Sequence, residues 1–275
     1  MPKDLAADAR DIPDDAPRDD LGVPVPAAAG ARRVVSLVPS LTEALALTCP
    51  EVLVGATDWC THPADLDVPR VRGTKNPDLR AIAALNPDVV IANKEENREF
   101  DVTRLRERGI PVWVTEITDV PSALASMGRL LAVLGHADPP WLVRANHLWA
   151  GSPPPPVRTV AMAVWRDPWM VVGDGTFAAD LLRRMGCANA FADRDRYPRV
   201  ELTDLDRPGI DAVLLPDEPY VFTAADGPEA FAVARPLLVS GRLLTWYGPA
   251  LLEAHAYALA QGWLPPARST SAGLG

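Results

Sequence analysis

The fold of this chain is decided at Pro87-Asp88-Val89-Val90-Ile91-Ala92, which runs directly into the polar cluster Asn93-Lys94-Glu95-Glu96-Asn97. A second run of the same kind, Ile210-Asp211-Ala212-Val213-Leu214-Leu215, leads into Pro216-Asp217-Glu218-Pro219-Tyr220. Short apolar runs like these are typical of strands covered on both faces of a sheet. Ligands of open α/β sheets bind outside the carboxyl ends of such strands. We therefore expect two α/β lobes with a ligand cleft between them.

Strands and helices alternate on both sides of the first run. In the first half the order is β-α-β-loop-α-β-α-β, which favours a parallel sheet. The second half repeats this order with little residue identity, and Arg242-Leu243-Leu244-Thr245 is expected to be its last strand. The fold class predicted is therefore α/β, with two Rossmann-like lobes built on parallel sheets and joined by a helical bridge.

The expected boundaries follow from composition and periodicity. We predict a disordered acidic, Pro-rich tail over residues 1–31, because the segment is rich in Asp and Pro. The remaining segments are an N-terminal lobe over 32–118, a bridging helix and Pro-rich connector over 119–156, a C-terminal lobe over 157–264 and a flexible tail over 265–275.

Charge and hydropathy exclude several classes of function. The 275 residues carry a formal net charge of -9 with no run of Lys or Arg, so no nucleic-acid partner is expected. No apolar run reaches the ~18 residues of a membrane span, so we expect no membrane insertion. No secretory signal or lipid-attachment cysteine is visible. We predict a cytoplasmic monomer, or a periplasmic or extracellular one if the true N-terminus is missing.

Two groups of residues invite a chemical interpretation. Cys60 and His62 are weak candidates for metal ligands, since thiolate and imidazole suit zinc or copper, but a loop with a free thiol and a solvated His explains them as well. The pairs Glu95-Glu96 and Asp217-Glu218 suit acid/base catalysis by a hydrolase or transferase. Carboxylates at a ligand rim are the favoured interpretation, because no nucleophile motif lies nearby. No catalytic residue is assigned.

The aromatic residues fall near expected strand ends or in loops. They offer flat apolar area with a polar handle, which suits a large flat ligand, although core packing is the alternative for each. The residues concerned are Trp59, Trp165, Trp169, Tyr220, Trp246 and Tyr247.

Three stretches resemble the substrate-binding proteins of ABC importers for cobalamin and ferric siderophores, and within that family the cobalamin-binding branch. They are Val34 to Glu43 (VVSLVPSLTE), Gly73 to Leu79 (GTKNPDL) continued by Leu85 to Val90 (LNPDVV), and Trp246 to Pro249 (WYGP). The resemblance spans residues 32 to 262.

The resemblance implies two α/β lobes joined by a long helix, a ligand bound between them and no catalysis. It also implies an importer permease as partner, docked through one surface glutamate per lobe, for which Glu99 and either Glu218 or Glu229 are the candidates. The ligand-binding residues implied are Ser36, Pro39, Ser40, Asp58, Trp59 and Asn93 in the first lobe, and Trp165, Asp217, Tyr220, Trp246 and Tyr247 in the second.

Our leading hypothesis is non-catalytic binding of a metal chelate, most readily a corrinoid such as cobalamin, with a ferric siderophore as the other ligand class and no cofactor required. The alternatives are a signal-less or truncated importer subunit, and a two-lobed enzyme that uses the four carboxylates.

Overall fold

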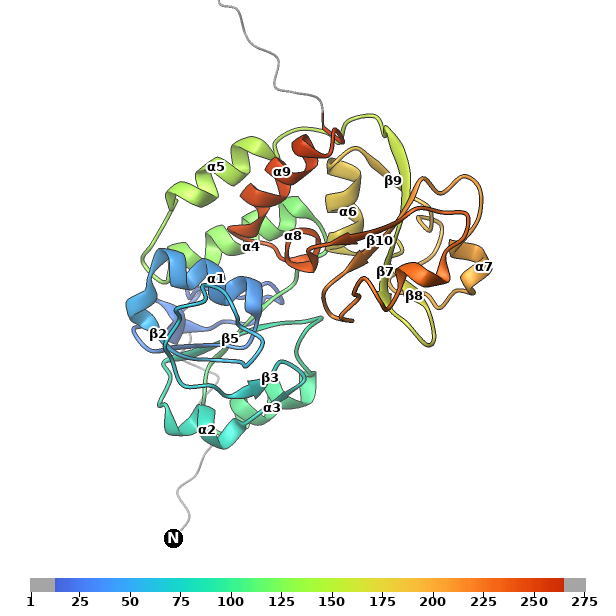
Figure 1. Cartoon of the computed structure of the whole chain (residues 1–275). Helices are drawn as coiled ribbons and strands as arrows, with labels where there is room; N and C mark the ends of the chain where they lie inside the picture. The colour runs from blue at the N-terminus through green and yellow to red at the C-terminus, as the bar shows by residue number, and fades with distance from the viewer. Residues whose placement is uncertain (1–12, 265–275) are drawn as a thin grey trace, which may run out of the picture. The chain divides into compact units, whose positions relative to one another are not determined.

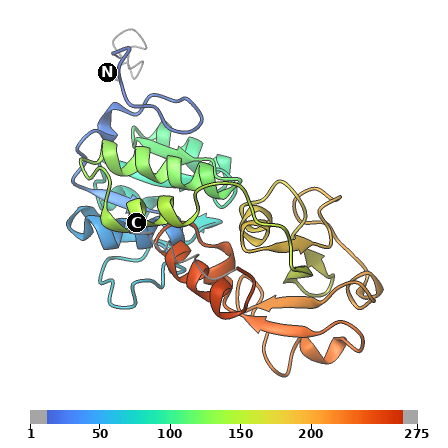
Figure 2. The same cartoon turned by 90° about the horizontal axis from the view of Figure 1, so that it is seen from above.

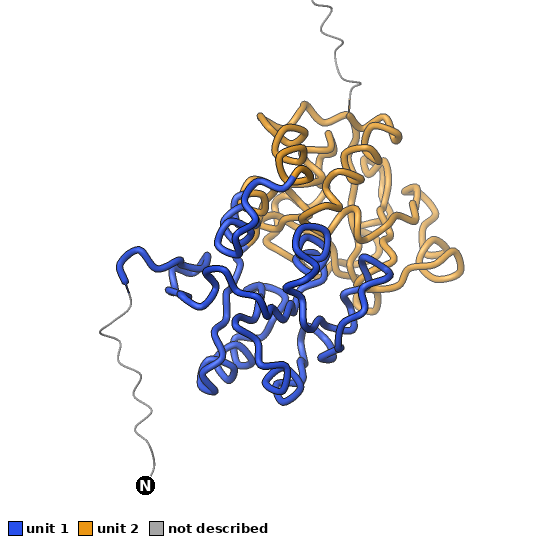
Figure 3. The backbone as a smooth tube through the Cα atoms, turned by 90° about the vertical axis from the view of Figure 1, so that its left-hand side faces the viewer, with its two compact units in different colours: residues 1–116, 125–139 blue, residues 117–124, 140–275 orange. Residues whose placement is uncertain are grey.

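The computed structural model describes residues 13–264; the tails expected at residues 1–12 and 265–275 lie outside the described residues. The chain forms two compact units, coloured separately in Figure 3. Unit 1 comprises residues 1–116 and 125–139, and unit 2 comprises residues 117–124 and 140–275. Both are α/β, as the sequence predicts. Helix α4 (Val120–Val133) begins in unit 2 and ends in unit 1.

Unit 1 is built on a four-stranded parallel sheet in the order β2-β1-β5-β6. Its strands are β1 (Val34–Ser36), β2 (Leu53–Ala56), β5 (Val89–Asn93) and β6 (Val112–Thr115), with a small antiparallel pair β3 (Arg72–Gly73) and β4 (Asn76–Pro77). Its helices are α1 (Pro39–Thr48), α2 (Leu79–Ala84) and α3 (Glu99–Glu107), with 3₁₀ turns at Pro26–Ala28 and Pro50–Val52.

Strand β5 is one of the two inner strands of this sheet, because it pairs with both β1 and β6. All five of its residues are buried, as expected for a strand covered on both faces. Its apolar side chains pack with those of β1, β6, α2 and α3 in one core, which includes Val35, Ile82 and Leu105. The run that decides the fold in sequence is therefore the core strand of unit 1.

The disordered tail predicted for residues 1–31 is wrong for residues 13–31, which form an ordered segment that we call the N-terminal arm. The side chain of Asp19 is fully buried, and its Oδ2 accepts hydrogen bonds from the backbone N of Val114 and from Arg106 Nη2, both at 3.2 Å. Its Oδ1 accepts from the backbone N of Leu21 at 3.0 Å and of Val23 at 2.9 Å.

Asp20 continues this attachment. Its backbone N donates to the carbonyl of Val114 at 3.1 Å, and its Oδ2 accepts from the backbone N of Glu116 at 2.9 Å. The same carboxylate binds Ser126 Oγ at 2.5 Å and Arg129 Nη2 at 2.7 Å, both on α4. The prediction of disorder relied on the acidic composition of this segment. It failed because Asp19 and Asp20 accept hydrogen bonds from backbone N–H groups at β6, the last strand of the sheet.

Unit 2 carries a five-stranded sheet in which the order is β11-β10-β7-β8 and β9 also pairs with β7. Its strands are β7 (Arg158–Trp165), β8 (Met170–Val171), β9 (Cys187–Asn189), β10 (Ala212–Pro216) and β11 (Pro236–Val239). Its helices are α5 (Pro140–Leu148), α6 (Phe177–Arg184), α7 (Leu202–Leu205), α8 (Gly241–Thr245) and α9 (Ala250–Ala260), with a 3₁₀ turn at Pro228–Ala230. Helices α5 and α9 lie side by side (Figures 1 and 2), and Trp149 Nε1 donates to the carbonyl of Leu251 at 3.1 Å.

Two sequence predictions need correction in unit 2. Strand β8 is antiparallel to β7, because the short connection over residues 166–169 reverses the chain as a hairpin does. Residues 242–245 are helical, and the last strand is Pro236–Val239. The helix is favoured because the carboxylate of Asp217 accepts a hydrogen bond at 2.7 Å from the backbone N of Gly241, the first residue of α8.

Candidate functional site

Within unit 1, the predicted site residues gather where β1 and β5 end. We call this region, made of Ser36–Ser40, Thr57–Trp59 and Asn93–Asn97, the carboxyl edge of unit 1. Ser36 is fully buried and accepts a hydrogen bond at 2.7 Å from Thr42 Oγ1 on α1. Ser40 is also buried, whereas Pro39 at the start of α1 is partly exposed. Ser36 therefore links β1 to α1, and Pro39 is the partly exposed residue of the turn.

Asn93 organises the loop that follows β5. Its Oδ1 accepts from the backbone N of Glu95 at 2.8 Å and of Glu96 at 3.2 Å, while its Nδ2 donates to Thr115 Oγ1 at 3.1 Å. Its own backbone N donates to Asn97 Oδ1 at 2.8 Å. Asn93 is buried, so its role here is to position Glu95 and Glu96 at the edge, where both are partly exposed.

Asp58 and Trp59 lie at the surface of the loop after β2. Trp59 is 65% exposed, a large value for an indole. A Cβ atom at Gly73 would lie 3.1 Å from Trp59 Nε1 and 2.5 Å from Asn76 Oδ1, so this glycine lets the indole approach the turn between β3 and β4. Trp59 therefore presents an accessible aromatic face that is supported from one side.

Cys60 and His62 do not form a metal site in this structure. The Sγ of Cys60 is fully buried, 3.0 Å from Thr42 Oγ1 and 3.1 Å from Thr57 Oγ1, and burial raises the pKa of its thiol. His62 is partly exposed, with its Nδ1 3.1 Å from Thr61 Oγ1. Between residues 13 and 264, no three His, Cys, Asp or Glu side chains form a metal-binding group.

Unit 2 has a corresponding carboxyl edge, which we define as Trp165–Asp167 after β7, Asp217–Tyr220 after β10 and Ser240–Tyr247 after β11. Trp165 is 45% exposed, and its ring meets that of Tyr220 edge-on, with centroids 5.5 Å apart and planes at 76°. Asp217 is exposed although its Oδ1 holds the start of α8. The structure therefore brings Trp165, Asp217 and Tyr220 to one edge of the unit 2 sheet.

A charged network fixes Tyr220. Its hydroxyl donates to Asp226 Oδ2 at 2.7 Å, and the other oxygen of Asp226 binds Arg166 Nη1. Arg166 Nη1 also lies 2.5 Å from Glu229 Oε1. The hydrogen bond to Asp226 is the main reason that the pKa of Tyr220 is raised. Sequence analysis missed Arg166 and Asp226, because nothing in their spacing of 60 residues links them.

Trp246 and Tyr247 are buried, at 6% and 5% exposure. Trp246 Nε1 donates to Glu218 Oε1 at 2.5 Å, and the ring of Tyr247 meets Phe177 edge-on at 5.5 Å. Both rings therefore pack beneath the edge and support its shape, whereas Trp59 and Trp165 are accessible.

The three glutamates predicted to dock on a permease differ in their surroundings. Glu99 is exposed in the first turn of α3. Glu218 is partly buried, desolvation raises its pKa, and its carboxylate is bound by Trp246. Glu229 is paired with Arg166 and also accepts from the backbone N of Gly227 at 2.6 Å. Glu218 and Glu229 thus have internal partners, and Glu99 and Glu229 are the exposed residues of the three.

Carboxylates outnumber cations among the exposed or partly exposed charged residues of the two edges. Lys75 Nζ donates to the carbonyl of Glu95 and Lys94 Nζ pairs with Glu116, both at 2.5 Å. Arg166 is likewise committed to carboxylates. Exposed or partly exposed carboxylates at the edges are Asp58, Glu95, Glu96, Asp167, Asp217 and Glu218, and Asp167 Oδ2 lies 3.8 Å from Arg166 Nε.

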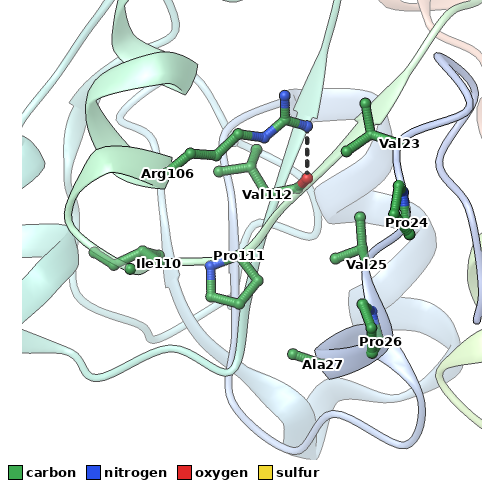
Figure 4. A pocket seen from close by; sticks show the side chains of 10 residues that line it. Val23, Pro24, Val25, Pro26, Ala27, Arg106, Ile110, Pro111 and Val112 are labelled. Carbon is green, nitrogen blue, oxygen red and sulfur yellow. Dashed lines mark hydrogen bonds between the residues drawn. The ribbon is translucent and has the colours of Figure 1, made fainter. Parts of the chain in front are cut away.

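Two cavities lie away from these edges. One, of 280 Å³, is formed between the N-terminal arm (Val23 to Ala27) and the beginning of β6, where Arg106 Nη2 donates to the carbonyl of Val112 at 3.0 Å (Figure 4). The other, of 180 Å³, lies beside Trp149, Arg184 and His255 in unit 2. Neither contains a residue of the predicted site.

The chain was compared with known proteins, and no family model matches it. The vitamin B12-binding protein of Salmonella typhimurium is 29% identical over 178 residues, which is 62% of this chain and 66% of that protein, just under two thirds of its length. Among solved structures, the periplasmic heme-binding protein BhuT in complex with two hemes gives a TM-score of 0.70 at 23% identity, covering 84% of this chain and 99% of BhuT.

A second solved structure, the periplasmic vitamin B12-binding protein BtuF of Vibrio cholerae, gives a TM-score of 0.64 at 18% identity, covering 84% of this chain and 96% of that one. Both solved structures have the fold of this chain. The relative found by sequence, a vitamin B12-binding protein, is of the kind that the resemblance in the sequence indicates. The chain is therefore similar in sequence to a vitamin B12-binding protein, and it shares the fold of these periplasmic vitamin B12-binding and heme-binding proteins.

Proposed function

We propose that this chain binds a corrinoid, a cobalt chelate of the cobalamin type, without chemical turnover, through side chains of the two carboxyl edges. The observation that carries this proposal is the pair of exposed indoles, Trp59 in unit 1 and Trp165 in unit 2. Exposed tryptophans at strand ends are costly to leave in water and suit the flat face of a macrocycle. The relatives named vitamin B12-binding protein support the same class of ligand, whereas BhuT is named for heme.

The accessible charge supports a corrinoid over the other chelates of this family. The periphery of cobalamin carries neutral amides, which donate hydrogen bonds to carboxylates. Heme carries anionic propionates, and many ferric siderophores are anionic. Edges that expose the carboxylates of Asp58 and Asp217 would repel an anionic chelate and accept hydrogen bonds from an amide-bearing one.

The enzyme alternative has little support from the carboxylates that motivated it. Asp217 holds the backbone N of Gly241, and Glu218 accepts from Trp246. Glu95 and Glu96 are arranged by Asn93 through their backbone N–H groups. These contacts position the loops, and the relatives are named as binding proteins.

We further propose that the chain acts as the binding subunit of an importer, with a permease as partner and Glu99 as the accessible docking residue of unit 1. The cytoplasmic location predicted from the sequence has no support among the relatives, two of which are named as periplasmic, and we propose a location outside the cytoplasm. No helix between residues 13 and 264 is long and apolar enough to cross a membrane. Uptake of labelled cyanocobalamin by cells that carry or lack this chain tests the importer role.

Calorimetric and absorbance titrations of the purified chain test the ligand class. Cyanocobalamin and cobinamide should give heat and a shift of the visible corrinoid bands, and hemin and a ferric siderophore should bind more weakly. Absence of binding by both corrinoids would overturn the proposal. Binding of hemin in preference to the corrinoids would reassign the ligand within the same family.

A further inference from the structure

We propose that Asp226 and Glu229 are specificity-determining residues of unit 2, because they bind the guanidinium of Arg166 and so prevent it from binding a carboxylate of the ligand. The inference rests on the proposed function and deepens it, since it names side chains that favour an amide-bearing chelate over an anionic one. Neither carboxylate has to touch the ligand, because both act through Arg166 at the carboxyl edge.

Arg166 is placed where a ligand of this edge would meet it. It follows the exposed Trp165 directly at the end of β7, and its side chain is 22% exposed. Arginine binds carboxylates strongly, because its donors lie in one plane and match the two carboxylate oxygens. The second arginine of this edge, Arg242, pairs with Glu253 at 2.9 Å. A guanidinium without partners beside Trp165 would therefore attract a chelate that carries carboxylates.

Acidic side chains surround this guanidinium. Arg166 Nη1 donates to Asp226 Oδ1 and, at 2.5 Å, to Glu229 Oε1, and Arg166 Nε lies 3.8 Å from Asp167 Oδ2. The hydrogen bond from Arg166 is the main reason that the pKa of Glu229 is lowered, so this carboxylate is ionised at neutral pH. One cation thus faces three carboxylates, and the group as a whole is negative.

The two carboxylates on Nη1 are held by contacts that do not involve a ligand. Asp226 Oδ2 accepts the hydroxyl hydrogen of Tyr220 at 2.7 Å, and the backbone N of Asp226 donates to the carbonyl of Thr223 at 3.2 Å. Glu229 Oε2 accepts from the backbone N of Gly227 at 2.6 Å. A ligand carboxylate would have to displace one of these fixed acceptors and would be repelled by the other. The arrangement therefore selects against anionic ligands.

Matched corrinoids test the inference. Cyanocobalamin is compared with its b-, d- and e-monocarboxylic acids, in each of which a carboxylate replaces one peripheral amide. Calorimetric titration gives the ratio of acid to amide affinity in the wild type and in Asp226→Asn/Glu229→Gln, whose amides are isosteric with the carboxylates. We expect this ratio to rise by about fivefold in the double variant for at least one of the acids. Distortion of the site would weaken acid and amide alike, so the ratio reports the charge.

Arg166→Gln separates binding by the guanidinium from a simple loss of repulsion. Removal of two negative charges favours an anion even where no cation is present, whereas the inference requires the released guanidinium. The same two substitutions in an Arg166→Gln background should therefore raise the ratio much less. Glu229→Gln alone, which leaves Asp226 on Arg166, should raise it by a smaller factor in the same direction. Asp193→Asn, an exposed aspartate outside the carboxyl edge, should leave the ratio unchanged.

The outcomes distinguish this inference from the proposed function. A ratio that stays the same for all three acids in the double variant, or that rises equally with and without Arg166, would overturn the inference while cyanocobalamin still binds. Binding of hemin but not of cyanocobalamin by the wild type would overturn the proposed function, and hemin compared with its dimethyl ester would then replace the corrinoid pair, with the same shift expected. Absence of binding by all of these ligands would overturn both.

Discussion

Asp180 on α6 holds the first residue of α4: its Oδ2 accepts a hydrogen bond at 2.9 Å from the backbone N of Val120, 60 residues earlier in the chain. The side chain of Asp180 is 6% exposed and is also bound by Arg183 and, at 2.8 Å, by Arg184. A carboxylate at a helix N-terminus satisfies a free N–H and favours the helix dipole. This contact anchors, within unit 2, the helix that continues into unit 1.

Asp180→Asn should therefore destabilise the chain. The substitution removes the charge that binds two arginines and caps α4, and we expect a loss of about 2–3 kcal/mol in the free energy of unfolding. Chemical denaturation followed by circular dichroism measures it. Asp193→Asn, an exposed aspartate, is the control. Equal stability of the two variants would contradict the role of Asp180 as a cap.

The same residue predicts a dependence on pH. Burial opposes ionisation of Asp180, but its hydrogen bonds from Val120, Arg184 and Arg183 outweigh burial and lower its pKa below the ordinary value of 3.8. Because the folded pKa is depressed, the stabilisation is fully present above the unfolded pKa and is lost as the pH falls through the folded one. The stability difference between wild type and Asp180→Asn should shrink below about pH 4. A difference that stays constant from neutral to strongly acidic pH would contradict this assignment.

Asp19→Asn tests the N-terminal arm. The buried carboxylate accepts from four donors, among them Val114 and Arg106. The amide offers one oxygen in place of two and leaves Arg106 without its ion-pair partner, so we expect a loss of about 3 kcal/mol. Thermal unfolding measures the effect. Asp14→Asn, in the exposed part of the same arm, should leave the midpoint within the error of the wild type.

The exposed indoles give a prediction for binding. Trp59→Ala and Trp165→Ala should each weaken cyanocobalamin by at least about 1 kcal/mol, roughly fivefold, because each removes a large contact face. Leu47→Ala on α1 and Val143→Ala on α5 are controls, since they truncate exposed apolar residues away from the carboxyl edges. Calorimetric titration measures the affinity of each variant for cyanocobalamin. Equal affinities for the two tryptophan variants and the two control variants would show that neither indole contacts the ligand.

Gly241→Ala should be destabilising for a steric reason. A Cβ atom there would lie 2.4 Å from Glu218 Cγ and 2.8 Å from the carbonyl oxygen of Glu218, so the backbone itself must move. We expect a loss of about 1–3 kcal/mol, as for other overpacked sites. Ser240→Ala, at the preceding position, is the control. A folded Gly241→Ala variant of wild-type stability would show that the loop after β10 shifts at little cost.

The sequence predicts the framework of this molecule well, because buried parallel strands have a local signature. Val89 to Ala92 and Ala212 to Leu215 are short, wholly apolar runs, and every residue of both is buried in its sheet. The strand predicted for residues 242–245 is wrong, because a short apolar run is compatible with a strand or a helix. The carboxylate that favours the helix belongs to Asp217, which is too far away in sequence to be recognised as a cap.

The site is less predictable than the framework. Trp59, Trp165 and Tyr220 lie at strand ends as expected, but their exposure depends on neighbours that sequence spacing does not reveal. The indole N–H of Trp246 donates to the carboxylate of Glu218, and the hydroxyl of Tyr220 donates to Asp226, which is paired with Arg166. The order of the N-terminal arm is not predicted for a related reason. Composition alone does not reveal that Asp19 and Asp20 accept hydrogen bonds from backbone N–H groups of Val114 and Glu116.

That arm covers backbone groups on the outer edge of strand β6. Strand β6 is the last strand of its sheet, and an uncovered last strand can recruit the same strand of another molecule into a growing fibre. The N–H groups of Val114 and Glu116 are instead occupied by the carboxylates of Asp19 and Asp20, and the carbonyl of Val114 by the backbone of Asp20. Two aspartates in the arm thus keep the edge of unit 1 closed to intermolecular strand pairing.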